Sequence, residues 1–288
     1  MFSDFAIWYL FLAGTAGGAF LCGVVMDMRE NTGWDARRVS LRARCGIFSC
    51  VGLLALAALM LFLDLGNPYD ILYLFEQPLR SIVSVGAWLI VGCLACSVAT
   101  SALVVLRIDV PWLFRILEIL GGVAAVGVMG YTGVLLSSMT SIEFWNTPIV
   151  VVLFVASALS CGCACVEVAT FFTAGSARGL RDLEGAGRIL RVAEFAVLVA
   201  FMVSRWLAGA AAQQSCLLLV AGQLAGLFWG GLVLCGFAVP ALAGAGMRAL
   251  RVPALRLAGA ASTLIGGVCL RYCVVLAASY SAIGFAVT

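Results

Sequence analysis

Apolar residues run along this chain in eight long stretches, and polar residues gather in the short links between them. A run of about 20 apolar residues, folded as an α-helix, crosses a hydrocarbon layer about 30 Å thick. The stretches come close to this length or exceed it, so we expect an all-α integral membrane protein with eight transmembrane helices. The expected helices are residues 5–26, 46–64, 82–106, 114–138, 148–174, 190–207, 215–240 and 258–286.

The links between these stretches are short and hold residues that end helices or shape turns. Examples are Gly66-Asn67-Pro68, Asp109-Val110-Pro111, Asn146-Thr147-Pro148 and Arg251-Val252-Pro253. None of the links is long enough to fold as a soluble domain. We therefore expect residues 1–288 to form a single polytopic membrane domain.

The arginines predict how the chain is oriented, because cytoplasmic links carry an excess of basic residues. All 17 basic residues are arginines, and fourteen of them follow the first, third, fifth or seventh expected helix. The opposite side has only Arg80 and Arg205, while Arg271 lies within the last helix. We expect both termini on the non-cytoplasmic side of the cytoplasmic (inner) membrane of a prokaryote.

The overall composition agrees with a lipid environment. The chain is 64% hydrophobic and 11% charged, with a mean hydropathy of +1.14, whereas soluble domains are nearer half apolar and a quarter charged. The net charge of +3 gives no electrostatic reason to expect nucleic-acid binding. The N-terminus carries Asp4 and lacks a basic segment, so the first apolar run is expected to stay as a span and not to be cleaved as a signal peptide.

Metal and haem sites are not expected in this chain. Most of the 12 cysteines fall inside apolar runs, where Cys93–Cys96 and Cys161–Cys163 would sit in mid-helix and not in the tight loops that metal sites use. We interpret them as small packing residues. The chain has no His, which excludes haem held by two histidines.

Three polar clusters fall near the same leaflet. They are Trp8 and Tyr9 at the start of the first helix, Asp64 at the end of the second, and Tyr131 with Gly133 in the fourth. A quinone headgroup needs hydrogen-bond partners for two carbonyls, flat apolar walls and a route for protons. Tyr131 and Tyr9 can bind carbonyls, Asp64 can relay a proton, and Gly133 can let a ring approach the backbone. The alternative is that the aromatic residues are interfacial and Asp64 caps a loop.

Deeper charged groups form a second set. Glu118, Glu167, Glu194 and Arg271 are expected within helices, where charges are costly and usually face inward. A Glu194–Arg271 or Glu167–Arg271 ion pair would be a structural explanation, and a proton path through all four residues would be a functional one. The sequence alone leaves both open.

The links on the non-cytoplasmic side are aromatic, acidic and rich in amides. Asn67 and Pro68 lie in the link after the second helix, and Trp145 and Asn146 in the link after the fourth. Such residues can dock a partner protein, or they can form the aromatic belt that many membrane proteins carry at the interface.

Four segments resemble the NrfD family, whose members include polysulfide reductase-type quinone-binding membrane subunits. They begin with Trp8–Gly18 and Leu63–Pro68, the latter followed by Ser84–Trp88. Tyr131–Leu136, followed by Phe144–Pro148, and Gly266–Tyr272 complete the match. These segments occur in order and bracket nearly the whole chain.

The resemblance implies eight helices in two four-helix bundles, with no haem or metal of their own. It implies a ferredoxin-like iron–sulfur partner subunit, bound in turn to a catalytic subunit that often carries molybdopterin. Quinone or quinol, with menaquinone expected, would bind near the docking face, and the family pattern places its tyrosine at Tyr131 and its acidic motif at Asp64 and Asn67. Some relatives have a His in the first helix near the quinone, and this protein has none.

Three functions follow as hypotheses. The leading one is a membrane anchor that exchanges electrons between quinone and an external cluster, so that catalysis belongs to the whole complex. The second is a secondary transporter or proton channel that uses Glu167, Glu194 and Arg271. The third is a passive anchor that binds no quinone.

Overall fold

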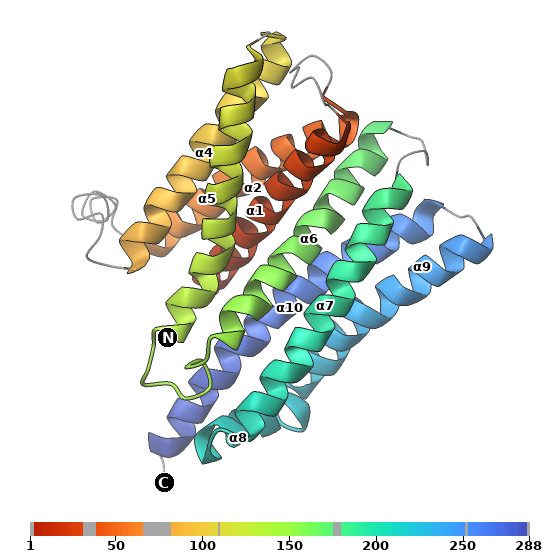
Figure 1. The fold of residues 1–288 in the computed structure, drawn as a ribbon. Coiled ribbons are helices and arrows are strands. Elements are labelled where there is room, and N and C mark those ends of the chain that lie inside the picture. The colour runs from red at the N-terminus through yellow and green to blue at the C-terminus, as the bar shows by residue number, and fades with distance from the viewer. Residues whose placement is uncertain are drawn as a thin grey trace.

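The computed structural model describes residues 3–30, 39–65, 82–108, 110–174, 180–250 and 253–286, and every regular element among them is a helix (Figure 1). The helices are α1 (Asp4–Glu30), α2 (Leu41–Leu65), α4 (Ile82–Leu106), α5 (Pro111–Ser137), α6 (Ile149–Ala174), α7 (Leu180–Trp206), α8 (Ala210–Val220), η2 (Leu227–Ala238), α9 (Val239–Leu250) and α10 (Pro253–Ala286).

Seven helices within the described ranges are long and apolar enough to cross a membrane. They correspond to seven of the eight expected spans. The remaining expected span, residues 190–207, lies within α7, which is 27 residues long and is the least apolar of the long helices. Because α7 begins ten residues earlier than expected, it includes Glu184 and Arg188 in addition to Arg191 and Glu194. The count of eight spans therefore stays a prediction.

The expectation of one continuous helix over residues 215–240 is wrong. Helix α8 ends at Val220, residues 221–224 form a turn, and the polypeptide is helical again from residue 225, continuing as the π-helix η2. Gly222 and Gly226 flank the break, and glycine weakens helices because it has much backbone freedom to lose. The indole Nε1 of Trp229 donates a 3.0 Å hydrogen bond to the carbonyl of Val220 and so bridges the interruption.

The described helices lie side by side, and the bundle that they form has two ends that differ in the residues they hold. Both termini are at one end, together with the 138–148 link (Figure 1); we call this the terminal end. The opposite end holds Arg42, Arg115, Arg188 and Arg256 and is called the arginine-rich end. In the first group, α1, α2, α4 and α5 form a closed ring of contacts, while α6, α7, α9 and α10 form the second group. The division into two four-helix bundles and the sidedness of the termini remain predictions.

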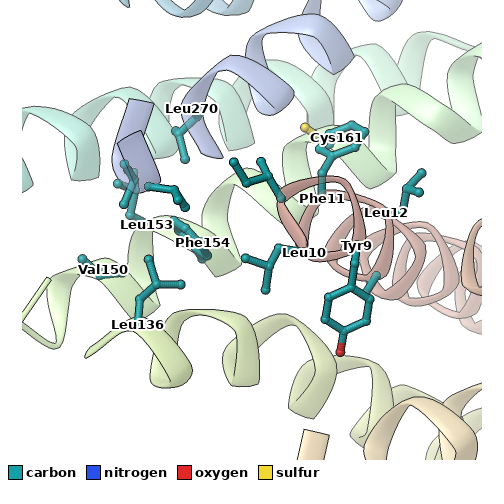
Figure 2. Packing of buried hydrophobic residues seen from close by; sticks show 14 of the residues in the cluster. Tyr9, Leu10, Phe11, Leu12, Leu136, Val150, Leu153, Phe154, Cys161 and Leu270 are labelled. Carbon is teal, nitrogen blue, oxygen red and sulfur yellow. The ribbon is translucent and has the colours of Figure 1, made fainter. Parts of the chain in front are cut away.

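Helix α1 joins the two groups, because it packs against α2 and α5 on one side and against α6 and α10 on the other. Its side chains are accordingly buried all around the helix: Tyr9 points toward α5, whereas Phe11 points away from it, beside Cys161 (Figure 2). The crossing with α6 is tightest at Gly18 and Gly162. A Cβ atom on either glycine would overlap the backbone of the other helix, so only glycine permits this approach.

Candidate functional site

A pair of tyrosines lies between α1 and α5 near the terminal end. Tyr9 is 5% exposed and Tyr131 is 6% exposed, and their phenol groups form a hydrogen bond with each other. Figure 2 shows the Tyr9 hydroxyl directed at α5. A hydroxyl has one proton and two acceptor lone pairs, so the bond between the two phenols uses only one of their two protons. The sequence predicted that these two residues would lie together, and the structure brings them into contact.

The ring of Tyr131 rests on the backbone of α4 at Gly86. A Cβ atom at position 86 would overlap the atoms of this ring. Gly86 therefore sets the position of the Tyr131 ring. The signal was present in the motif Ser84–Trp88, which is one of the segments that carry the family resemblance.

Gly133 is not part of the tyrosine pair. A Cβ atom there would lie 2.5 Å from the Cα of Val151 in α6, so Gly133 allows α5 and α6 to pack closely. The reason is helix geometry, because residues two apart point to nearly opposite sides of a helix. A quinone ring against Gly133, as expected from the sequence, does not fit this placement.

Trp8 also faces away from Tyr131. Its ring packs edge-on against Phe11, with centroids 6.2 Å apart, and it is 40% exposed. Trp8 contacts the hydroxyl of Tyr272 in α10, which in turn donates a 3.4 Å hydrogen bond to Asp4. The structure thus places Trp8 at the contact between α1 and α10, at the terminal end.

Asp64 lies at the terminal end of α2 with an exposed side chain. It accepts a hydrogen bond from the hydroxyl of Ser3, which ties the segment before α1 to the end of α2. This is compatible with either a proton relay or a loop cap. Asn67 and Pro68, the other predicted residues of this link, lie outside the described residues.

The 138–148 link is held firmly against the second group. Trp145 is 2% exposed, and its Nε1 donates a 2.8 Å hydrogen bond to the carbonyl of Val274 in α10. Arg205 donates hydrogen bonds of 3.0 and 3.3 Å to the carbonyls of Glu143 and Asn146. The ring of Trp145 is therefore inside the protein, contrary to the docking role predicted for it. Asn146 is exposed at this end.

Glu118 is fully buried in α5 near the arginine-rich end. It forms an ion pair with Arg115 at 2.8 Å, and its carboxyl group faces that of Asp27 in α1, which is also 0% exposed. Sequence reasoning missed Asp27, because this residue lies next to the arginine-rich link that follows α1, where a charged residue is ordinary. Glu118 thus belongs to the first group of helices, away from the other predicted deep charges.

Arg271 is also fully buried, at the junction of α1, α6 and α10. Its guanidinium donates hydrogen bonds to the Ser157 hydroxyl at 3.0 Å and to the Gly267 carbonyl at 3.1 Å. The rings of Phe11 and Phe154 lie 5.5 and 5.3 Å from its Cζ atom, within the range of cation–π attraction. No carboxylate among the described residues lies within ion-pairing distance of Arg271.

Glu194 and Glu167 are the two deep carboxylates of the second group. Glu194 is 4% exposed, and its carboxyl group lies near the hydroxyls of Ser157 and Ser160. Ser157 therefore lies between Glu194 and Arg271 and takes the place of the ion pair that the sequence left open. Glu167 lies nearer the arginine-rich end, opposite Arg191 of α7.

The cysteines in the described ranges are free thiols within helices. Among the residues that the structure describes, no three His, Cys, Asp or Glu side chains come together as a set of metal ligands. Several of the thiols contact one another between helices, such as Cys22 with Cys163 and Cys50 with Cys93. These contacts are compatible with the interpretation of the cysteines as packing residues.

Comparison with known proteins agrees with the motif resemblance. Residues 2–284 match the family model described as Polysulphide reductase, NrfD. Over 260 residues the sequence is 28% identical to the C subunit of the polysulfide reductase of Wolinella succinogenes, an alignment that covers 81% of this protein and 79% of the relative. With its apolar helices, the protein is a multi-pass membrane protein and belongs to the NrfD family.

Proposed function

We propose that this protein is the quinone-binding membrane subunit of a multisubunit reductase complex. The observation that carries the proposal is the Tyr9–Tyr131 pair, packed on Gly86 near the terminal end of an NrfD-family protein. The similarity to one subunit of a polysulfide reductase supports the assignment to a complex. Quinol supplies two electrons and two protons when it is oxidised, and quinone takes up the same number when it is reduced.

The tyrosine pair has the chemistry that a headgroup carbonyl requires. The hydroxyl proton that the pair does not use can be donated to a carbonyl oxygen of the bound ring, while the contact with Tyr9 keeps the Tyr131 hydroxyl in place. Gly86 fixes the Tyr131 ring from the other side, so the donor is held in one position. A donor that is positioned in advance binds more strongly, because less side-chain freedom is lost on binding.

Electrons would pass between the quinone and an iron–sulfur partner subunit docked at the terminal end. Asn146 on the 138–148 link is the described residue that best fits such docking, and Asn67 and Pro68 stay in the proposal from the sequence. Asp64, exposed at the same end, is suited to exchange protons with the surroundings. Through the iron–sulfur subunit the protein would serve a catalytic subunit of the molybdopterin type, with menaquinone as the expected quinone.

The direct test is a fluorescence titration of the purified complex with a quinol-analogue inhibitor, comparing the wild type with Tyr131→Phe. Loss of one hydrogen bond is expected to weaken binding by about 0.5–1.5 kcal/mol, or roughly two- to tenfold in Kd. Tyr272→Phe is the matched control, because Tyr272 lies at the same end but contacts Trp8 and Asp4.

Saturable binding that weakens only in Tyr131→Phe would support the site. Binding that responds equally to both substitutions would place the headgroup nearer α10. Absence of saturable binding in the wild-type complex would overturn the quinone function and leave a passive anchor.

A further inference from the structure

The thiols of Cys22 and Cys163 meet beside the tight crossing of α1 and α6. Cys163 follows Gly162 directly, and Cys22 follows Gly18 by about one helical turn. A Cβ atom on Gly162 would lie 2.2 Å from the carbonyl carbon of Gly18, so the two backbones are in contact there. The thiols of Cys22 and Cys163 contact each other. A disulfide needs Cα atoms about 4.4–6.8 Å apart, and a crossing this close brings neighbouring residues into that range.

Two charged groups lie beside Cys163, around the space left by Gly187 in α7. A Cβ atom on Gly187 would lie 3.5 Å from the Sγ atom of Cys163, 3.5 Å from Glu167 Oε1 and 3.3 Å from Arg191 Nη1. The Glu167 Oε1 atom is buried without a hydrogen-bond partner among the described residues. The Cys163 thiol donates a 3.5 Å hydrogen bond to the carbonyl of Leu183. A carboxylate can accept the proton of a thiol, and a nearby arginine stabilises the thiolate, which is the reactive form of cysteine.

A small cavity between α6, α7, α9 and α10 reaches the same two charged groups. Glu167 and Arg191 line it, together with Glu184, Arg256 and mostly apolar residues of α9 and α10. Its volume is about 20 Å³, which is enough for one or two water molecules. Hydrogen peroxide is close to this size, whereas a quinone or a disulfide-containing peptide is far larger. The cavity therefore favours a small peroxide as the oxidant that reaches this part of the protein.

We propose that Cys22 and Cys163 form a peroxide-sensitive dithiol, which links α1 to α6 by a disulfide when it is oxidised. The Sγ atom of Cys163 gives its proton to Glu167 and attacks one oxygen of hydrogen peroxide. The O–O bond breaks, the leaving hydroxide takes up that proton and becomes water, and Cys163 becomes a sulfenic acid. The Cys22 sulfur then attacks the sulfenic sulfur, the S–O bond breaks, and the Cys22 proton leaves with the hydroxide as a second water. Two thiols and one peroxide thus give one disulfide and two waters.

The disulfide connects the two groups of helices. Helix α1 belongs to the first group and α6 to the second, and Cys22 and Cys163 lie beside the point where these two helices cross most tightly. Neither step of the oxidation involves the tyrosine pair. Disulfide formation and quinone binding are therefore tested separately, and either can fail without the other.

The first experiment treats the purified, reduced full-length protein with hydrogen peroxide. Remaining thiols are blocked with N-ethylmaleimide, and linked peptides are identified by mass spectrometry without reduction. We expect a disulfide between Cys22 and Cys163. Cys163→Ser should abolish this link, whereas Cys161→Ser should preserve it, because the Cys161 thiol points elsewhere and donates to the carbonyl of Thr263 in α10. Failure of the wild-type protein to form the link, or its persistence in Cys163→Ser, would overturn the proposal.

Cys50 and Cys93 provide a matched control pair within the same protein. Their thiols also contact each other, between α2 and α4, and the other polar groups that act on Cys50 are Ser97 and Cys165. Because no charged group is among them, we expect this pair to form a disulfide about tenfold more slowly, or not at all. Equal rates for the two pairs would mean that contact alone governs oxidation, and would refute a site built by Glu167 and Arg191.

The second experiment measures the activation of Cys163 directly. In a Cys22→Ser protein the sulfenic acid on Cys163 cannot condense, so dimedone traps it and mass spectrometry follows its formation. Adding Arg191→Gln should slow this formation about tenfold, because the thiolate loses its guanidinium. Arg188→Gln is the control, since Arg188 lies on the same helix but is half-exposed and pairs with Glu184. The proposal is wrong if Arg191→Gln leaves the rate unchanged or if both arginine variants slow it equally.

Discussion

The first and second groups of helices bury their polar groups in different ways. In the first group, Tyr9 and Tyr131 contact each other directly, and Glu118 contacts Arg115 at 2.8 Å, although the Oε1 atom of Glu118 is buried without a hydrogen-bond partner among the described residues. In the second group, Arg271 has no carboxylate partner among the described residues, and Glu167 keeps a buried oxygen without a hydrogen bond. The difference lies in how the charged groups meet: Glu118 has an arginine in direct contact, whereas the Ser157 hydroxyl separates Arg271 from Glu194.

Helix α1 belongs to the first group but also forms one wall of the Arg271 site. Because α1 contacts both groups, the tyrosine pair and the Arg271 site are on two sides of the same helix. Substitutions at these contacts test whether the two regions differ in stability and in ligand binding.

The largest expected effect is a loss of stability when the contact between the two groups of helices is disturbed. Gly162→Ala would place a Cβ atom against the backbone of α1 at Gly18, and backbone atoms cannot give way as a flexible side chain can. We expect the free energy of unfolding to fall by about 3 kcal/mol, measured by thermal unfolding in detergent. Gly52→Ala in α2, where no atom lies within 4 Å of the added group, is the control and should be neutral or slightly stabilising. Equal stability of both variants would mean that the groups do not depend on this crossing.

An intermediate effect is expected at Gly86. Gly86→Ala should displace the Tyr131 ring and weaken quinol-analogue binding about tenfold, equivalent to about 1.4 kcal/mol, in the same titration. Gly92→Ala lies on the same helix in open space and should bind as the wild type does. If the two alanine variants bind alike, the position of the Tyr131 ring does not govern the site.

The smallest effect is expected at Trp8, which tests where the site ends. Trp8→Phe keeps an aromatic ring beside Phe11 at the α1–α10 contact, and we expect less than a twofold change in analogue Kd, or below about 0.4 kcal/mol. A loss as large as that of Tyr131→Phe would extend the quinone site from the first group to α10 and remove the distinction between the two regions.

The apolar runs located six of the spans well, because length and hydropathy depend on local sequence. The break after Val220 escaped detection, since the glycines that flank it lie among apolar residues and do not interrupt the hydrophobic run. Tyr9 and Tyr131 were placed together because topology puts both near one end. Gly133 was misjudged because it is near Tyr131 along the sequence, although residues two apart on a helix point in different directions. Gly86 lies in the motif Ser84–Trp88, but its contact with Tyr131, like the contact of Asp27 with Glu118, depends on packing between helices, which the sequence alone does not show.

The buried position of Arg271 also bears on how the protein is assembled. An arginine at the centre of a helix opposes insertion into the membrane by about 2.5–3.5 kcal/mol, and α10 is synthesised after all the other described helices. The groups that receive this side chain, Phe11, Phe154 and Ser157, belong to helices that were made earlier. Helix α10 therefore inserts against a prepared site, and a protein truncated before α10 would leave that site without the residue that joins α1 and α6 to this helix.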